Sequence, residues 1–86
     1  MIRKGATLPS AMVKRSVNIA GHNTSVTLED AFWTAVREIS AIQNIGKSEL
    51  VSRVAKNRQN KNLSSAIRLF VLAYYRQAAE TRDRDS

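Results

Sequence analysis

The spacing of apolar residues changes from a strand-like to a helical pattern at Leu28. Between Lys14 and Leu28 the chain is rich in Val, Ile, Thr and Ser, which suit extended backbone. From there on, apolar residues recur every three or four positions, as one face of a helix requires. The members of this stripe are Leu28, Phe32, Ala35, Ile39 and Ile42. The pattern predicts a strand region and then a helix that ends near residues 43–46, with Thr27 and Asp30 as its capping box.

The strand region contains one break in its alternation. Val17 and Ile19 occupy odd-numbered positions, whereas Val26 and Leu28 occupy even-numbered positions. One unbroken strand cannot place both pairs on the same face. Either a bulge or a tight turn near Gly21 would change the register, because Gly and Asn adopt positive φ at low cost.

Two further helical segments follow. Gly46 opens the first, which carries Leu50 and Val54 on its apolar face and runs to about Lys56. The polar residues 57–62 predict a surface loop. A third helix is expected at residues 65–77, with Asn62 or Ser64 as its cap. This helix is apolar nearly all round and therefore needs cover on several sides.

The ends of the chain lack such patterns. Residues 1–13 mix Gly, Pro and small residues without a period, and we expect them to form a flexible basic arm. Residues 79–86 alternate in charge and are expected to be disordered. A single domain is therefore predicted over residues 14–78.

The net charge of the chain indicates what kind of molecule it binds. Fourteen Lys and Arg against seven Asp and Glu give a net charge of +7, which favours a polyanion such as nucleic acid. The absence of cysteine excludes disulfides and thiolate sites. The most apolar stretch, residues 66–75, is far shorter than the roughly twenty residues that span a bilayer. We expect a cytoplasmic protein that needs no cofactor.

Catalysis is not expected from these residues. His22 is the only histidine and lies in a predicted turn. The carboxylates are placed at helix starts, on helix surfaces or in the tail, and neither a phosphate-binding glycine run nor a metal-ligand cluster is present.

The string TSVTLEDAFWTAVREISAIQNIGKSELVSRVAK resembles the ribbon-helix-helix family of DNA-binding proteins. Its VTLEDAFW segment, together with NLSSAIRLFVL downstream, is similar to one bacterial subfamily, and the resemblance covers about residues 14–77. It implies a mainly α-helical homodimer with one short strand per chain, paired antiparallel across the dimer, and a third C-terminal helix. It also implies a transcription regulator, most simply a repressor, that binds duplex DNA.

The physical argument points the same way. An isolated strand leaves its backbone groups unpaired, and pairing with a second copy satisfies them. Such a ribbon fits the major groove of DNA. With Val26 and Leu28 turned toward the helices, the outward side chains are expected to contact base edges. These side chains are Asn23, Ser25 and Thr27.

Those three side chains are short, whereas the family commonly carries Arg, Lys or Gln there, so Lys14, Arg15 or His22 are alternative base-reading residues. Phosphate contacts are expected from the basic strand region and from the start of the second helix, where free N–H groups favour an anion. The expected phosphate-contacting residues are Lys14, Arg15, Gly46, Lys47 and Ser48.

The apolar positions define the expected core and dimer interface. They are Val26, Leu28, Phe32, Ile39, Leu50, Val54, Ile67, Phe70, Val71 and Tyr74.

Two other functions are compatible with the same sequence. An antitoxin would use the same DNA-binding half and a C-terminal segment for a toxin, although few residues follow the third helix. A protein-interaction module without nucleic acid is the alternative from another class.

Overall fold

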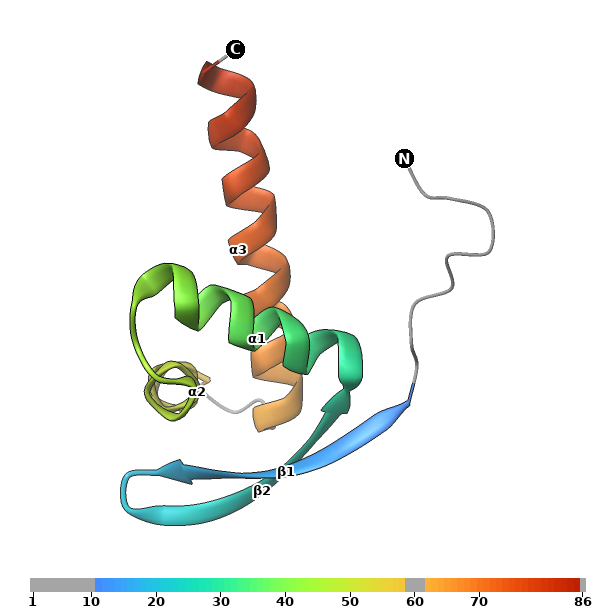
Figure 1. Cartoon of the computed structure of the whole chain (residues 1–86), viewed down its shortest axis with the longest axis vertical. Coiled ribbons are helices and arrows are strands. Elements are labelled where there is room, and N and C mark those ends of the chain that lie inside the picture. The colour runs from blue at the N-terminus through green and yellow to red at the C-terminus, as the bar shows by residue number, and fades with distance from the viewer. Residues whose placement is uncertain (1–10, 59–61, 86) are drawn as a thin grey trace.

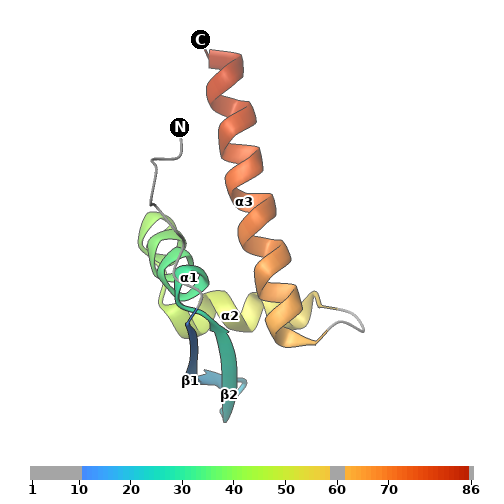
Figure 2. The ribbon, with the colours of Figure 1, turned by 90° about the vertical axis from the view of Figure 1, so that its right-hand side faces the viewer.

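A computed structural model describes residues 11–58 and 62–85 and shows a two-stranded antiparallel sheet followed by three helices (Figure 1). The elements are β1 (Met12–Ile19), β2 (His22–Glu29), α1 (Asp30–Gln43), α2 (Lys47–Lys56) and α3 (Leu63–Asp85). The sheet lies beneath α1 and α2, and α3 rises away from it (Figures 1 and 2). None of the helices in the described residues combines the length and apolar character needed to cross a membrane.

A tight turn, rather than a bulge, explains the break in the alternation. Ala20 and Gly21 join the strands with φ values of 53° and 86°, which is the positive-φ pair of a type I′ hairpin. The Gly21 N–H donates to Asn18 Oδ1 at 3.1 Å. In the resulting register Val17 pairs with Thr24 and Arg15 with Val26. Odd residues of β1 therefore share a face with even residues of β2.

The expectation of one strand per chain is wrong, because β1 and β2 pair with each other within the chain. The partner that β2 requires is thus supplied by the segment just before it. Met12 and Val13 of the predicted arm belong to β1, and residues 1–10 lie outside the described residues.

The predicted ends of the helices differ from those observed at three places, one of which is the start of α3, at Leu63 in place of residue 65. Leu28 and Thr27 remain in the ladder with β1, so α1 begins at Asp30, after the N-cap Glu29, without a side-chain cap. The predicted capping box is therefore wrong. Helix α3 continues to Asp85, through residues expected to be disordered, because Ala, Glu and Arg are good helix formers.

The predicted bounds of α2 are confirmed, since Gly46 is its N-cap and Lys56 its last residue. Of the two residues predicted to cap α3, Asn62 and Ser64, the structure shows Asn62 as the cap. Its Oδ1 accepts a hydrogen bond from the Ser65 N–H at 2.8 Å, whereas the Ser64 hydroxyl is used elsewhere.

The core lies between the inner face of the sheet and the three helices. Most of the predicted core is buried within the single chain: Val26, Leu28, Ile39, Leu50, Val54, Ile67 and Val71. Phe32, Phe70 and Tyr74 are only partly buried and pack against its margin.

The buried face of helix α1 is shifted from the predicted stripe, and Ile39 is common to both. Its buried residues are Trp33, Val36, Ile39 and Ser40, whereas Ile42 is 66 % exposed. The direction in which β2 leads into α1 sets this face, and the Trp33 Nε1 donates to the Val13 carbonyl at 2.8 Å. The contact with β1 thus draws the indole inward in place of Phe32.

Candidate nucleic-acid interface

The outer face of the sheet is a continuous polar surface built from both strands. Alternate residues of each strand point to this face, and the six side chains along its middle are exposed. Their cross-strand pairs are Lys14 with Thr27, Ser16 with Ser25, and Asn18 with Asn23. These six residues include one cation and no carboxylate, so they present donors and acceptors of the kind that base edges require.

The predicted residues Asn23, Ser25 and Thr27 lie together on this face, as their shared odd numbering indicated. Ser16 and Asn18 of β1 share it and were missed by the sequence reasoning. The alternation of Val17 and Ile19 would have identified them, had the turn been chosen over the bulge.

Lys14 and Arg15, which are adjacent in sequence, point to opposite faces of β1. Lys14 lies on the outer face, whereas Arg15 pairs with Val26 and reaches Trp33. The Arg15 guanidinium carbon lies 6.0 Å from the centre of the Trp33 ring, and the Lys47 ammonium lies 5.7 Å from it. The indole therefore brings together two cations from β1 and α2.

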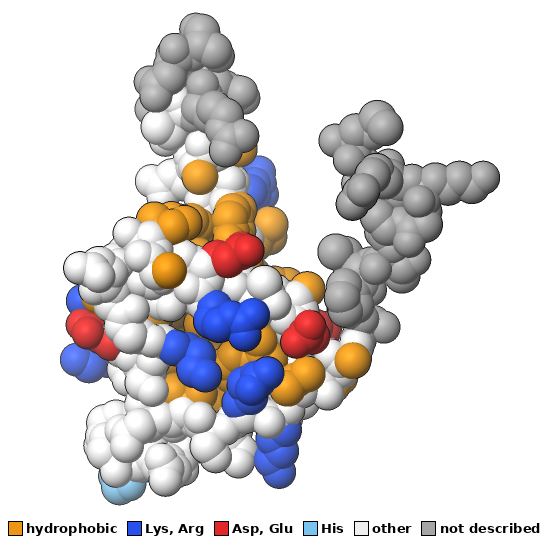
Figure 3. Space-filling view, in the orientation of Figure 1, with side chains coloured by type: hydrophobic (Ala, Val, Ile, Leu, Met, Phe, Trp, Pro, Cys, Tyr) orange, Lys and Arg blue, Asp and Glu red, His pale blue; other side chains and the backbone are white. Residues whose placement is uncertain are grey.

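These two cations have no acidic partner among the side chains that the structure describes, those of residues 11–58 and 62–81, where the ion pairs are Arg53 with Glu49 and Arg68 with Glu29. In the view of Figure 3, Lys and Arg side chains gather over the middle of the molecule, above the sheet. We call the arrangement of Arg15, Lys47 and Trp33 the indole cluster.

The start of α2 lies beside the indole cluster. Gly46 has extended backbone, with φ −74° and ψ 156°, and no side chain caps the helix. The first N–H groups of a helix lack partners within it, so those of Lys47 and Ser48 are available to an anion. The structure thus brings Arg15, Gly46, Lys47 and Ser48 together, and it places Lys14 apart from them, on the outer face of the sheet.

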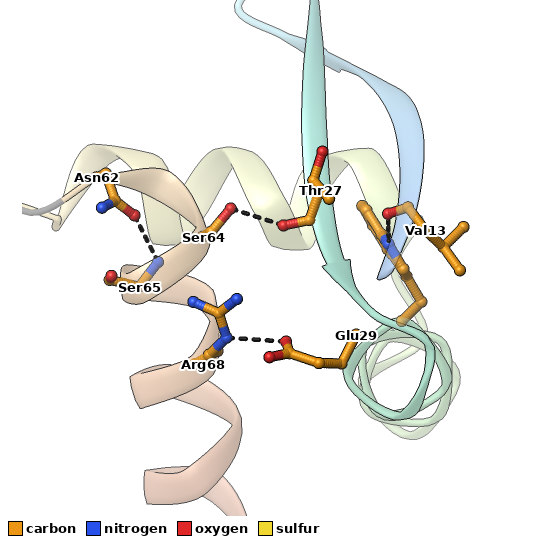
Figure 4. Close-up of polar contacts among 8 residues, drawn as sticks. Val13, Thr27, Glu29, Asn62, Ser64, Ser65 and Arg68 are labelled. Carbon is orange, nitrogen blue, oxygen red and sulfur yellow. Dashed lines mark hydrogen bonds and ion pairs between the residues drawn. The ribbon is translucent and has the colours of Figure 1, made fainter. Parts of the chain in front are cut away.

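The edge of β2 that faces away from β1 lies against α3 (Figure 4). The Ser64 hydroxyl donates to the Thr27 carbonyl at 2.9 Å, and the Arg68 Nε lies 2.9 Å from Glu29 Oε1. The hydrogen bond from Arg68 lowers the pKa of Glu29 below its ordinary value. Next to these contacts lies a hollow of about 390 Å³ between β2 and α3.

A second, larger groove of about 460 Å³ lies between α2 and α3. Its apolar lining residues are Leu50, Val54, Ala66, Leu69 and Phe70. Leu69 and Leu72 of α3 are 49 % and 52 % exposed. The sequence reasoning missed both leucines because it assigned the interface to residues that the single chain already buries.

Comparison with known proteins agrees with this architecture. A family model described as a ribbon-helix-helix domain matches residues 12–75, which include β1 as well as β2. A solved structure, that of an uncharacterized protein from Bordetella pertussis Tohama I, is similar with a TM-score of 0.73 and 30 % sequence identity. The similarity covers 87 % of this chain and 64 % of that one, so the chain spans less than two thirds of that protein. No curated protein matches the chain.

Proposed function

The chain belongs to the ribbon-helix-helix family, and on that premise we propose that it is a transcription regulator, most simply a repressor, whose β1–β2 ribbon enters the major groove of duplex DNA. The role is non-catalytic and requires no cofactor. A cytoplasmic location is part of the proposal, because the DNA would be there.

The observation that carries this proposal is the outer face of the ribbon. Its strands are about 4.8 Å apart, and a major groove about 12 Å wide admits a two-stranded ribbon. Ser and Asn side chains line the middle of this face without a carboxylate that would repel DNA. Asn recognises adenine through paired hydrogen bonds, so Asn18 and Asn23 are the residues that we expect to discriminate most strongly.

The indole cluster would hold the phosphate backbone beside the groove. Arg15 and Lys47 lie at the β1 side of the ribbon, next to the free N–H groups at the start of α2. Cations that release counterions from DNA supply affinity for every sequence, whereas contacts to base edges supply preference. The indole cluster would therefore supply affinity for every sequence, and the outer face of the ribbon would supply specificity.

A homodimer is also part of the proposal, with its interface in a place other than the ribbon. Because β1 already pairs with β2, one edge of β2 has its backbone partners without a second copy. The half-exposed Leu69 and Leu72 on α3 offer an apolar face instead. Since α3 rises away from the sheet (Figure 1), a two-fold axis along α3 would keep both ribbons on the same side of the dimer.

The proposal is tested by selecting duplexes from a random pool with the purified full chain and measuring affinity for the selected sequence and for random DNA. We expect Asn23→Ala and Asn18→Ala to lose preference for the selected sequence, while the matched control Thr81→Ala, exposed on α3, keeps it. If no duplex is retarded even at low salt, the proposal is wrong and an interaction module is favoured.

An antitoxin is the second candidate, and the apolar groove between α2 and α3 is the observation that favours it. A toxin would occupy that groove in place of a second copy of the chain. Purification of the protein from its own host with a second small protein bound in fixed ratio would indicate this function.

A further inference from the structure

We propose that Arg37 of α1 is a third phosphate-binding cation beside the indole cluster, so that β1, α1 and α2 together hold one stretch of DNA backbone. The inference rests on the proposed function. It adds α1 to the DNA-binding surface, which otherwise consists of the ribbon and the start of α2.

Arg37 lies on the side of α1 that carries Trp33. Its side chain is exposed, whereas the buried residues of this helix are Trp33, Val36, Ile39 and Ser40. Residues four positions apart share a face of a helix, so Arg37 stands one turn beyond Trp33. It is rotated from Trp33 by about 40° round the helix axis, away from Val36 and Ile39. Arg37 therefore borders the buried face, next to the indole.

The direction of helical side chains turns the Arg37 guanidinium toward the cluster. Side chains of an α-helix lean toward its N-terminus, so that of Arg37 leans back over the turn that carries Trp33. Arg15 and Lys47 lie over the ring of Trp33. In the view of Figure 3, Lys and Arg side chains gather in this region of the molecule. The cation of α1 is thus directed toward those of β1 and α2.

The connection between α1 and α2 brings Lys47 to the same turn. Residues 44–46 are the whole connection, so α2 begins close to the end of α1. The Lys47 ammonium nevertheless lies 5.7 Å from the ring centre of Trp33, which belongs to the first two turns of α1. Lys47 therefore points back along α1, toward the turn that carries Arg37. A phosphate held by Lys47 is consequently within reach of the Arg37 guanidinium.

The charge of Arg37 is available to an anion. Among the side chains that the structure describes, none forms an ion pair with it, since the ion pairs join other residues. Its neighbour Glu38 accepts a hydrogen bond from Tyr75 of α3 at 2.9 Å and so lies on another side of α1. Asp30 shares the side of Arg37 but lies two turns away, about 10 Å along the axis. A guanidinium in this position can bind phosphate through two parallel hydrogen bonds.

The first test measures the salt dependence of affinity for the full chain and its variants on the selected duplex. We expect Arg37→Gln to reduce the magnitude of the log-affinity against log-salt slope by about one, and Arg37→Lys to keep most of it. Circular dichroism of each variant, which should match that of the wild type, separates these effects from unfolding.

A matched control separates a local contact from net charge. It combines Arg37→Gln with Ile42→Arg. Ile42 is 66 % exposed and lies about 140° round α1 from Arg37, so the double variant keeps the net charge but moves the cation to another side of the helix. Its slope should stay as low as that of Arg37→Gln. Arg76→Gln, which removes an exposed cation from α3, should change the slope much less.

The second test locates the contact on the DNA by replacing single phosphates with neutral methylphosphonates. Wild-type protein should lose affinity for replacements at a run of neighbouring phosphates on one strand of each half-site. Lys47→Gln and Arg37→Gln should each become insensitive to a replacement within that run, at adjacent positions.

The outcomes distinguish this inference from the proposed function. If wild-type protein binds duplexes but Arg37→Gln keeps the wild-type slope, or if the double variant regains it, Arg37 does not contact phosphate, and DNA binding through the ribbon still stands. Loss of sensitivity on different strands for Arg37→Gln and Lys47→Gln would show that Arg37 does not share the backbone stretch of the indole cluster. If the wild type binds no duplex, the proposed function fails and the role of Arg37 fails with it.

Discussion

Trp33 links the ribbon to the helices and also organises the cations of the interface. Its side chain is 1 % exposed, its Nε1 donates to the Val13 carbonyl, and its ring lies within about 6 Å of both Arg15 and Lys47. Sequence reasoning placed Arg15 and Lys47 among the phosphate contacts, but it did not connect the tryptophan with them. Nothing in the spacing of these residues shows that one ring would bring them together, because the hairpin register determines which way Arg15 points.

Base contacts and phosphate contacts should respond differently to substitution. Ser25→Ala removes a hydroxyl from the outer face of the ribbon and should cost about 1 to 3 kcal/mol of preference for the selected sequence. Lys47→Ala should weaken binding to all duplexes alike and lower the salt slope by about one. Equal losses on selected and random DNA for both variants would show that the outer face does not read bases.

The ion pair between Glu29 and Arg68 should make stability depend on pH. The pKa of Glu29 in the folded protein lies below its ordinary value of 4.5, chiefly because Arg68 donates to it. Its contribution to the free energy of unfolding is therefore present above the ordinary pKa and is lost as the pH falls through the folded value. Thermal unfolding measured between about pH 6 and pH 3 should show a smaller loss for Glu29→Gln than for the wild type. Parallel pH profiles would contradict this assignment.

The hairpin is the element that sequence reasoning came closest to predicting and yet left open. Val17 has an odd number and Val26 an even one, so the register of alternation had to change near Gly21. The structure has a tight turn there. Parity cannot distinguish a bulge from a turn, because either changes the register by one. Only the pairing of β1 with β2 decides between them, and that pairing is a tertiary contact.

Gly21 should matter through its backbone and Gly46 should not. A Cβ at either position meets no atom within 4 Å, so steric crowding is absent in both cases. Gly21 has φ of 86°, and Gly21→Ala should cost about 1 to 2 kcal/mol, since an L-residue is strained there. Gly46→Ala, with φ of −74°, is the matched control and should cost a few tenths to about 1 kcal/mol, from the weaker N-cap. Chemical denaturation of both variants measures the difference.

The two faces of α3 should differ sharply in their contribution to stability. Ile67 is 1 % exposed and Leu69 is 49 % exposed, although both belong to the run that looked apolar all round in the sequence. Ile67→Ala should cost about 2 to 5 kcal/mol, whereas Leu69→Ala should cost less than about 1.5 kcal/mol in the monomer. Denaturation at low protein concentration is the measurement, and equal losses would contradict the assignment of faces.

At the scale of the whole molecule, the single chain buries more than the sequence indicated. An unpaired strand was the strongest argument for an obligate dimer, and the hairpin weakens it, because β1 pairs with one edge of β2. Burial of Leu50, Ile67 and Val71 within one chain removes a second. What remains is the exposed apolar face of α3, so dimerisation is expected to be separable from folding.

The expected dimer can therefore be tested without unfolding the protein. Wild-type protein should sediment at twice 9.6 kDa at micromolar concentration. A variant with Leu69→Lys and Leu72→Lys should sediment as a monomer with unchanged circular dichroism, since charges are costly in an apolar interface but not in water. Wild-type protein that sediments as a monomer, or a double variant that remains dimeric, would show that α3 is not the interface.

Under the proposed function, a ribbon made within one chain would also free its target from palindromic sequence. When two identical strands form a ribbon, the operator mirrors their symmetry. Here a two-fold rotation about the Ser16–Ser25 pair would exchange Lys14 with Asn23 and Asn18 with Thr27, and these residues differ. Each strand can thus change by substitution without altering the other. A single protein copy would recognise an asymmetric half-site, and any inverted repeat in the operator would arise only from the arrangement of two copies.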